Sequence, residues 1–152
     1  MTKQVSLEIR GELDALHLIW TLLGQVMEAI PQARPLQQEC YNTLVAVQEG
    51  ATNVIRHAYG GILDRPFRVE ILVEGPRLQV SLVDVGPPFD PTQVEVFPKE
   101  ERPEEGGYGI YFMRTVMNEI RYARVGETNV LTMVKDFSLH PVPAGPPGED
   151  GA

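Results

Sequence analysis

The hydrophobic and polar positions of this chain change period along its length, and each period predicts a different kind of element. Residues 5–9 alternate apolar and polar side chains, which predicts a strand with one buried face. Residues 13–30 repeat apolar side chains at intervals of three and four, which predicts an amphipathic helix that Pro31 ends. A second helix is predicted over residues 35–59, closed by a Gly-Gly pair. Its apolar stripe consists of Leu44, Val47, Ala51, Val54 and Ala58.

The period then becomes two, the period of strands. Residues 67–73 and 78–84 alternate apolar and polar side chains on either side of a Gly-Pro turn, which predicts a β-hairpin. Residues 87–107 are rich in proline and acidic side chains and predict a long irregular loop, a feature that is either disordered or functional in a small domain. Two further strands are predicted over residues 121–125 and 130–135. A third helix precedes them, marked by Ile110, Met113, Met117 and Ile120.

The order of these elements predicts the fold class. The helices do not alternate one by one with the strands, which favours an α+β fold: a two-layer sandwich with the helices on one face of a mostly antiparallel sheet. A chain of 152 residues, 43% of them hydrophobic, has material for one such domain. We expect this domain over residues 1–137, followed by a flexible tail rich in proline and glycine over residues 138–152.

Composition excludes several classes of function. The net charge of −8 has the wrong sign for a protein that works by neutralising nucleic-acid phosphates, so direct nucleic-acid binding is not expected. Cys40 is the only cysteine, which excludes disulfide frameworks and multi-thiolate metal sites and favours a small buried hydrophobe. The sequence shows neither a membrane span nor the pattern of a secretory signal, and we expect a cytoplasmic protein without membrane contact.

Two polar side chains of the second predicted helix share one side of it. Glu49 and Asn53 are four residues apart, and they project roughly opposite the apolar stripe. One interpretation is a polar face turned to water. The other is a site in which Asn53 gives a carbonyl oxygen to a hard cation such as Mg²⁺ while Glu49 accepts a proton from a hydroxyl group.

Asp84 lies on the apolar side of its predicted strand. It has the same parity as Leu78, Val80 and Leu82, so its carboxylate is expected to be partly desolvated and to need a hydrogen-bond donor. The donor is either a group of the protein, such as a backbone N–H or an arginine, or a group of a ligand, such as an exocyclic amino group. Gly86 follows directly and lets a ligand approach the backbone closely.

Glycines gather at the entrance of the third predicted helix. Gly106, Gly107 and Gly109 lie where backbone N–H groups and the positive end of a helix dipole can meet phosphates, although such a segment is also typical of a simple hinge. The spacing matches neither the P-loop nor the dinucleotide-binding fingerprint.

Taken together, the three segments resemble a known family. They are similar to the N, G1 and G2 boxes of the GHKL superfamily of gyrase, Hsp90, histidine kinases and MutL. The matching motifs are, in order, Glu49-x-x-x-Asn53 with His-Ala-Tyr beyond it, Asp84-x-Gly86-x-x-Phe-Asp, and Gly-Gly-x-Gly109-Ile. The residues of these motifs are most similar to those of the small anti-sigma-factor serine kinases of bacterial partner-switching systems. The likeness extends to about Phe137, and it implies the Bergerat, or histidine-kinase-like ATPase, fold.

The resemblance implies a role for each matching position. Glu49 would be the general base, Asn53 the Mg²⁺ ligand and Asp84 the acceptor for the adenine amino group. Gly86 would make room for the base, and Thr128 would help near the adenine. Residues 91–105 would form a nucleotide lid. The glycines of the third box would wrap the phosphates, and they are Gly106, Gly107 and Gly109.

The implied function is that of a serine/threonine protein kinase that uses ATP and Mg²⁺. It would phosphorylate a small antagonist protein of the anti-sigma-factor system and otherwise sequester a second partner, a sigma factor or another regulator. A homodimer is a further possibility, since the predicted N-terminal strand offers an edge. Two alternatives remain open: a nucleotide-dependent binding module without kinase activity, and a detached histidine-kinase ATPase domain.

Overall fold

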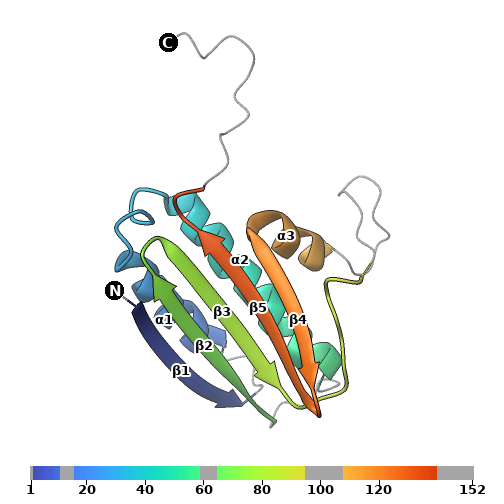
Figure 1. Cartoon of the computed structure of the whole chain (residues 1–152). Coiled ribbons are helices and arrows are strands. Elements are labelled where there is room, and N and C mark those ends of the chain that lie inside the picture. Colours follow the sequence, from blue (N-terminus) through green and yellow to red (C-terminus); the bar gives the residue numbers. More distant parts are fainter. Residues whose placement is uncertain (1, 11–15, 59–64, 95–107, 140–152) are drawn as a thin grey trace, which may run out of the picture.

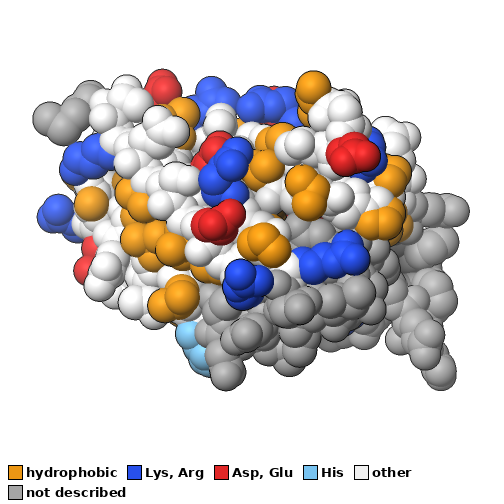
Figure 2. Space-filling view, turned by 90° about the horizontal axis from the view of Figure 1, so that it is seen from below, with side chains coloured by type: hydrophobic (Ala, Val, Ile, Leu, Met, Phe, Trp, Pro, Cys, Tyr) orange, Lys and Arg blue, Asp and Glu red, His pale blue; other side chains and the backbone are white. Residues whose placement is uncertain are grey.

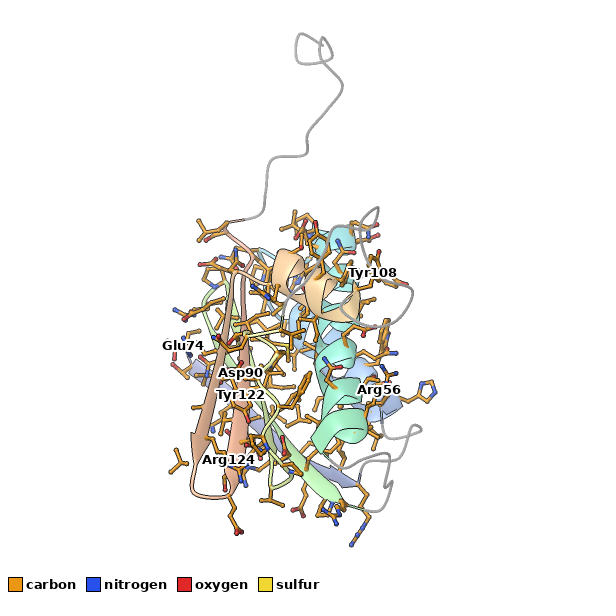
Figure 3. All side chains as sticks on the ribbon, turned by 90° about the vertical axis from the view of Figure 1, so that its right-hand side faces the viewer. Arg56, Glu74, Asp90, Tyr108, Tyr122 and Arg124 are labelled. Carbon is orange, nitrogen blue, oxygen red and sulfur yellow. The ribbon has the colours of Figure 1, made fainter. Side chains whose placement is uncertain are left out.

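The computed structural model describes residues 2–10, 16–58, 65–94 and 108–139. Its five strands form one antiparallel sheet, and its helices cover one face of that sheet (Figures 1 and 3). The strands lie in the order β1 (Thr2–Arg10), β2 (Pro66–Glu74), β3 (Arg77–Asp84), β5 (Thr128–Asp136) and β4 (Glu119–Val125). The predicted α+β sandwich is therefore confirmed.

In the part of the chain that the structure describes, the helical layer consists of three α-helices and one π-helical turn. The α-helices are α1 (Leu16–Glu28), α2 (Gln37–Asn53) and α3 (Tyr108–Val116). A π-helix, η2 (Val54–Ala58), continues α2 directly. Both α1 and α3 pack against α2, which gives α2 a central place in the layer.

The core lies between the sheet and the helices. The parity predicted for the hairpin is confirmed, because the apolar side chains of β2 and β3 that share one face are buried. The core side chains with almost no exposed surface include Leu23, Val47, Ile71, Leu78, Leu82, Met113 and Met133.

The buried face of α2 is wider than its predicted stripe. Val47, Ala51 and Val54 are buried as expected, whereas Leu44 is only half-buried. Further residues of the helix are buried as well: Thr43, Ala46, Gly50 and Asn53. Because α3 packs against α2, a second side of the helix is removed from water. The amphipathic pattern alone predicted only one of these two contacts.

The third helix is shorter than predicted. Ile120 was assigned to it, but α3 ends at Val116 and Ile120 belongs to β4. The backbone N–H of Asn118 already donates to the carbonyl of Val134 on β5, so the chain has joined the sheet at that point. Ile120 fits both patterns, since it lies three residues after Met117 and also alternates with Tyr122 along the strand.

A buried ion pair joins the two layers near the end of β5. The Nζ of Lys135, whose side chain is 2% exposed, lies 2.6 Å from Oε2 of Glu39 on α2. It also donates to the carbonyl of Val116 at the C-terminal end of α3, at 3.1 Å. One ammonium group thus holds α2, α3 and the sheet together.

Cys40 is half-buried rather than fully buried. Its Sγ donates to the carbonyl of Ala33 at 3.3 Å. Burial raises the pKa of the Cys40 thiol, and the neighbouring Glu39 carboxylate raises it further.

In the described part of the chain, the helices are too short or too polar to reach across a bilayer. The expected tail falls almost wholly outside the described residues, as do residues 95–105 of the expected lid.

Candidate functional site

A small pocket lies between the end of α2 and the end of β3. Its free volume of about 20 Å³ is close to the space of a single water molecule. The segment that follows β3 closes one side of it, and the hairpin of β4 and β5 contributes to its wall. The lining residues are Gly50, Asn53, Val54, Asp84, Pro87, Phe89, Pro91, Tyr122 and Leu131.

Asp84 ends β3 with its side chain buried at 7% exposure, as its parity predicted. Its Oδ1 accepts hydrogen bonds from the backbone N–H of Gly86 at 2.9 Å and from Nδ2 of Asn129 at 2.8 Å. Within the described residues, both donors of Asp84 therefore reach the same oxygen. The other oxygen, Oδ2, remains able to accept a donor within the pocket that Asp84 lines.

Asn129 holds the end of β3 through both ends of its amide. Its Nδ2 also donates to the carbonyl of Gly86 at 2.8 Å. Its Oδ1 accepts from the hydroxyl of Tyr122 at 2.8 Å and from the guanidinium of Arg124 at 2.7 Å. Arg124 donates to the Gly86 carbonyl as well, at 3.0 Å. The turn after β3 is thus fixed by hydrogen bonds from β4 and β5.

Asn53 lies at the last position of α2, directly before the π-helical turn. Its side chain is 8% exposed, which excludes the water-facing interpretation for this residue. Its Nδ2 is buried and has no hydrogen-bond partner among the described residues. A buried amide without a partner is costly, so this group is a strong candidate for contact with a ligand.

The amide of Asn53 fits a Mg²⁺ ligand. A half-turn about the Cβ–Cγ bond exchanges Nδ2 for Oδ1 and presents a carbonyl oxygen at the unpartnered position, and Mg²⁺ prefers oxygen ligands. The side chain lines the same pocket as Asp84.

Glu49 lies against the beginning of α3. A Cβ atom built on Gly109 would overlap Oε2 of Glu49 and would come within 2.9 Å of its Cδ. Only glycine permits this approach, and the half-buried Glu49 carboxylate thereby meets the N-terminal end of a helix, where the dipole favours negative charge. The structure thus brings together a residue of the first predicted box and a glycine of the third.

The remaining predicted positions differ in their outcome. Gly86 lies in the fixed turn beside Asp84. Thr128 begins β5 and, by strand alternation, projects to the face opposite that of Asn129. The structure therefore brings Asn129, and not Thr128, to Asp84. Gly106 and Gly107 lie outside the described residues.

Sequence reasoning missed three residues of this group: Asn129, Tyr122 and Arg124. A signal for the first was present, because Asn129 shares the parity of Leu131 and Met133 on an apolar strand face. The same argument had identified Asp84. Tyr122 and Arg124 lie one above the other on β4 in Figure 3, and nothing in their spacing distinguished them from surface residues.

In the view from below, basic side chains are interspersed with acidic ones (Figure 2).

Comparison with known proteins gives a consistent result. The family model described as the histidine kinase-like ATPase domain matches residues 18–135. The serine-protein kinase RsbW of Bacillus pumilus is 33% identical over 105 residues, which are 62% of this chain and 65% of that protein. The RsbW of Bacillus subtilis is 33% identical over 84 residues, covering 51% and 52% of the two chains. The matches thus span less than two thirds of these relatives.

A solved structure agrees on the fold. It contains the RsbU and RsbW domains of Rv1364c from Mycobacterium tuberculosis and aligns with a TM-score of 0.61 at 12% sequence identity. The alignment covers 88% of this chain and 32% of that one.

Proposed function

The chain belongs to the family of histidine kinase-like ATPase domains, and from this premise we propose that it is a serine/threonine protein kinase dependent on ATP and Mg²⁺. Its substrate is a small antagonist protein of an anti-sigma-factor system, and its second partner is a sigma factor or another regulator. The names of the RsbW relatives support the reaction type.

The observation that carries this proposal is the placement of three side chains along the C-terminal half of α2 and at the end of β3. Asp84 and Asn53 line a common pocket, and Glu49 lies one helical turn before Asn53 against the start of α3. An acceptor for an amino group, an amide that can hold a cation and a carboxylate that can accept a proton suit the binding of a nucleotide and the transfer of its phosphoryl group.

Each side chain has a defined task in the transfer. Asp84 Oδ2 accepts a hydrogen bond from the adenine amino group, and Gly86 lets the base approach. Asn53 holds Mg²⁺, which neutralises charge on the phosphates when it is bound. Glu49 accepts the proton of the serine or threonine hydroxyl while the hydroxyl oxygen of the substrate attacks the γ-phosphorus. The bond from that phosphorus to the bridging oxygen breaks, and ADP leaves.

Calorimetric titration with ATP tests the site. The full chain is expected to bind ATP more tightly with Mg²⁺ than without it. Asp84→Asn should weaken binding by at least about tenfold in both conditions, because it changes one carboxylate oxygen from an acceptor to a donor. Asn53→Ala should remove the dependence on Mg²⁺ while leaving binding without the metal unchanged.

Asp136→Asn is the matched control for Asp84→Asn. Asp136 is a carboxylate at the other end of the β3 and β5 pair, where its Oδ1 accepts hydrogen bonds from Ser138. Its replacement should leave ATP binding unaltered. Absence of nucleotide binding to the wild type at millimolar ATP would refute the proposed kinase function.

Gly109→Ala tests the contact between α3 and Glu49. The added methyl group must displace the carboxyl end of Glu49, which is flexible, so the free energy of unfolding should change by less than about 1 kcal/mol. Phosphoryl transfer should fall by about 10²-fold because the carboxylate is moved. Unfolding in urea and transfer from labelled ATP measure the two effects.

Gly24→Ala is the control for this substitution. It also adds a methyl group to a helical glycine, but among the described residues no atom beyond the local helix backbone and the two chain neighbours lies within 4 Å of the new position. Transfer should be unchanged in this variant. Wild-type transfer by Gly109→Ala would show that the position of the Glu49 carboxylate is not important for the reaction.

A further inference from the structure

Asn129 is a buried polar residue whose hydrogen-bonding capacity is fully used. It is 1% exposed, its Nδ2 donates two hydrogen bonds and its Oδ1 accepts two. An amide with four bonds cannot rotate or flip without losing several of them. The orientation of Asn129 is therefore determined by its surroundings rather than by its own rotamer preference.

This fixed amide restrains the carboxylate of Asp84. The two residues are direct partners in the register between β3 and β5, so the bond from Nδ2 of Asn129 to Oδ1 of Asp84 connects neighbouring backbones. The N–H of Gly86 reaches the same oxygen from the chain's own turn. Rotation of the carboxylate would break both bonds, which leaves Oδ2 as the oxygen that a ligand meets.

Arg124 extends this restraint to the backbone. Its guanidinium donates to Oδ1 of Asn129 and to the carbonyl of Gly86, the same carbonyl that Nδ2 of Asn129 bonds. The peptide groups at Gly86 are therefore held through both N–H and C=O. The turn against which a base would stack has the same rigid support as the carboxylate.

We propose that Asn129 and Arg124 are positioning residues that set the selectivity of the pocket for a purine with an amino group at its six-position. The proposal rests on the proposed function, that this pocket takes a purine nucleotide. A fixed Oδ2 accepts from a six-amino group. The same oxygen opposes the carbonyl of a six-oxo purine, because two acceptors then face each other without a proton between them.

Loss of the restraint changes the two cases in opposite directions. A carboxylate that rotates freely binds the amino group less well, since its ordering must occur on binding. It also turns away from a six-oxo group and relieves the repulsion. The ratio of the two affinities is therefore the quantity that a positioning role moves, whereas general damage to the pocket weakens both nucleotides alike.

The experiment compares ATP with inosine triphosphate, which differs from ATP by an oxo group in place of the amino group. Dissociation constants are measured calorimetrically for the full-length wild type, Asn129→Ala and Arg124→Ala. We expect the wild type to prefer ATP, and Asn129→Ala to reduce that preference by about tenfold, with inosine triphosphate affinity kept or improved. Arg124→Ala should reduce it by about threefold, because Arg124 acts through Asn129 and the turn.

Arg121→Ala is the matched control. Arg121 is an exposed arginine of the same strand, and it pairs with Glu119 rather than with the pocket. The Arg121→Ala variant should prefer ATP over inosine triphosphate by the same factor as the wild type. Thermal melting shows whether each variant is folded. If Asn129→Ala does not fold, Arg124→Ala still tests the proposal, because Arg124 is exposed and its replacement is expected to leave the protein folded.

Each remaining outcome is decisive. Equal weakening of both nucleotides, or an unchanged ratio in both variants, overturns the positioning role while the proposed function stands. A wild type that binds neither nucleotide overturns both.

Discussion

Replacing Glu49 with Gln is expected to lower phosphoryl transfer by about 10²–10⁴-fold and to leave ATP affinity nearly unchanged. Gln has the shape of Glu but cannot accept the proton of the attacking hydroxyl. The half-buried carboxylate lies against the start of α3, outside the residues that line the pocket of Asp84, so base binding does not depend on it. Transfer is measured from γ-labelled ATP to a small antagonist protein, and the affinity is measured by calorimetry.

Two comparisons make this result interpretable. Gln48→Ala, an exposed neighbour on α2, should transfer at the wild-type rate. The label on the substrate should be stable in acid, as phosphoserine and phosphothreonine are, whereas an acid-labile label would indicate transfer to histidine. Undiminished transfer by Glu49→Gln would remove Glu49 from the role of general base. Absent transfer in every variant, with intact ATP binding, would support a nucleotide-dependent binding module.

Replacing Glu39 with Gln is expected to have the largest effect on stability. The substitution leaves the ammonium of Lys135, 2% exposed, without its counter-charge, and because the Glu39 side chain is 22% exposed the loss should lie at the lower end of the ~3–5 kcal/mol that breaking a buried pair costs. The hydrogen bond from Lys135 to the carbonyl of Val116 remains, but it does not neutralise the charge. Urea unfolding followed by far-ultraviolet circular dichroism measures the change.

An exposed pair on the other face of the sheet serves as the control. Arg68 and Glu70 are 2.7 Å apart with side chains 50% and 37% exposed, so Glu70→Gln should cost less than about 1 kcal/mol. The double variant Glu39→Gln with Lys135→Met should recover most of the lost stability, because it removes the buried charge itself. A loss below 1 kcal/mol for Glu39→Gln alone would show that Lys135 finds water or another partner.

Period and parity predicted the buried face of the central hairpin, but the buried face predicted for residues 5–9 is realised only in part, because Ile9 is buried whereas Val5 is 38% exposed on the edge strand β1. The alternation that ends in Asp84 placed a carboxylate on the core side, and the structure shows it there with two donors. The same reasoning could have identified Asn129. Lys135 shares this parity too, but the sequence could not identify the partner of its ammonium group. Its burial depends on α2 and α3, which are distant in the sequence.

The helical pattern was less informative where one helix has two neighbours. Glu49 and Asn53 lie opposite the apolar stripe, which agrees equally with a face turned to water and with a face covered by another helix. Contact of α3 with α2 decides between them, and a single sequence does not report that contact. For Gly109, the glycine that permits it, the sequence predicts a phosphate contact or a hinge. Its observed role is to make room for Glu49.

The small free volume between Asp84 and Phe89 has a kinetic consequence. A space of about 20 Å³ admits a water molecule but not a purine ring, so the lining residues, which include Pro87, Phe89 and Pro91, must move apart before a base can enter. Where this movement is slower than encounter with the nucleotide, the observed binding rate should reach a plateau as nucleotide concentration rises. The measured affinity also contains the equilibrium of that opening. On the proposed function, the hydrogen bond of 3.2 Å from the N–H of Phe89 to the hydroxyl of Tyr122 would slow nucleotide exchange, because it holds the segment around Phe89 in place.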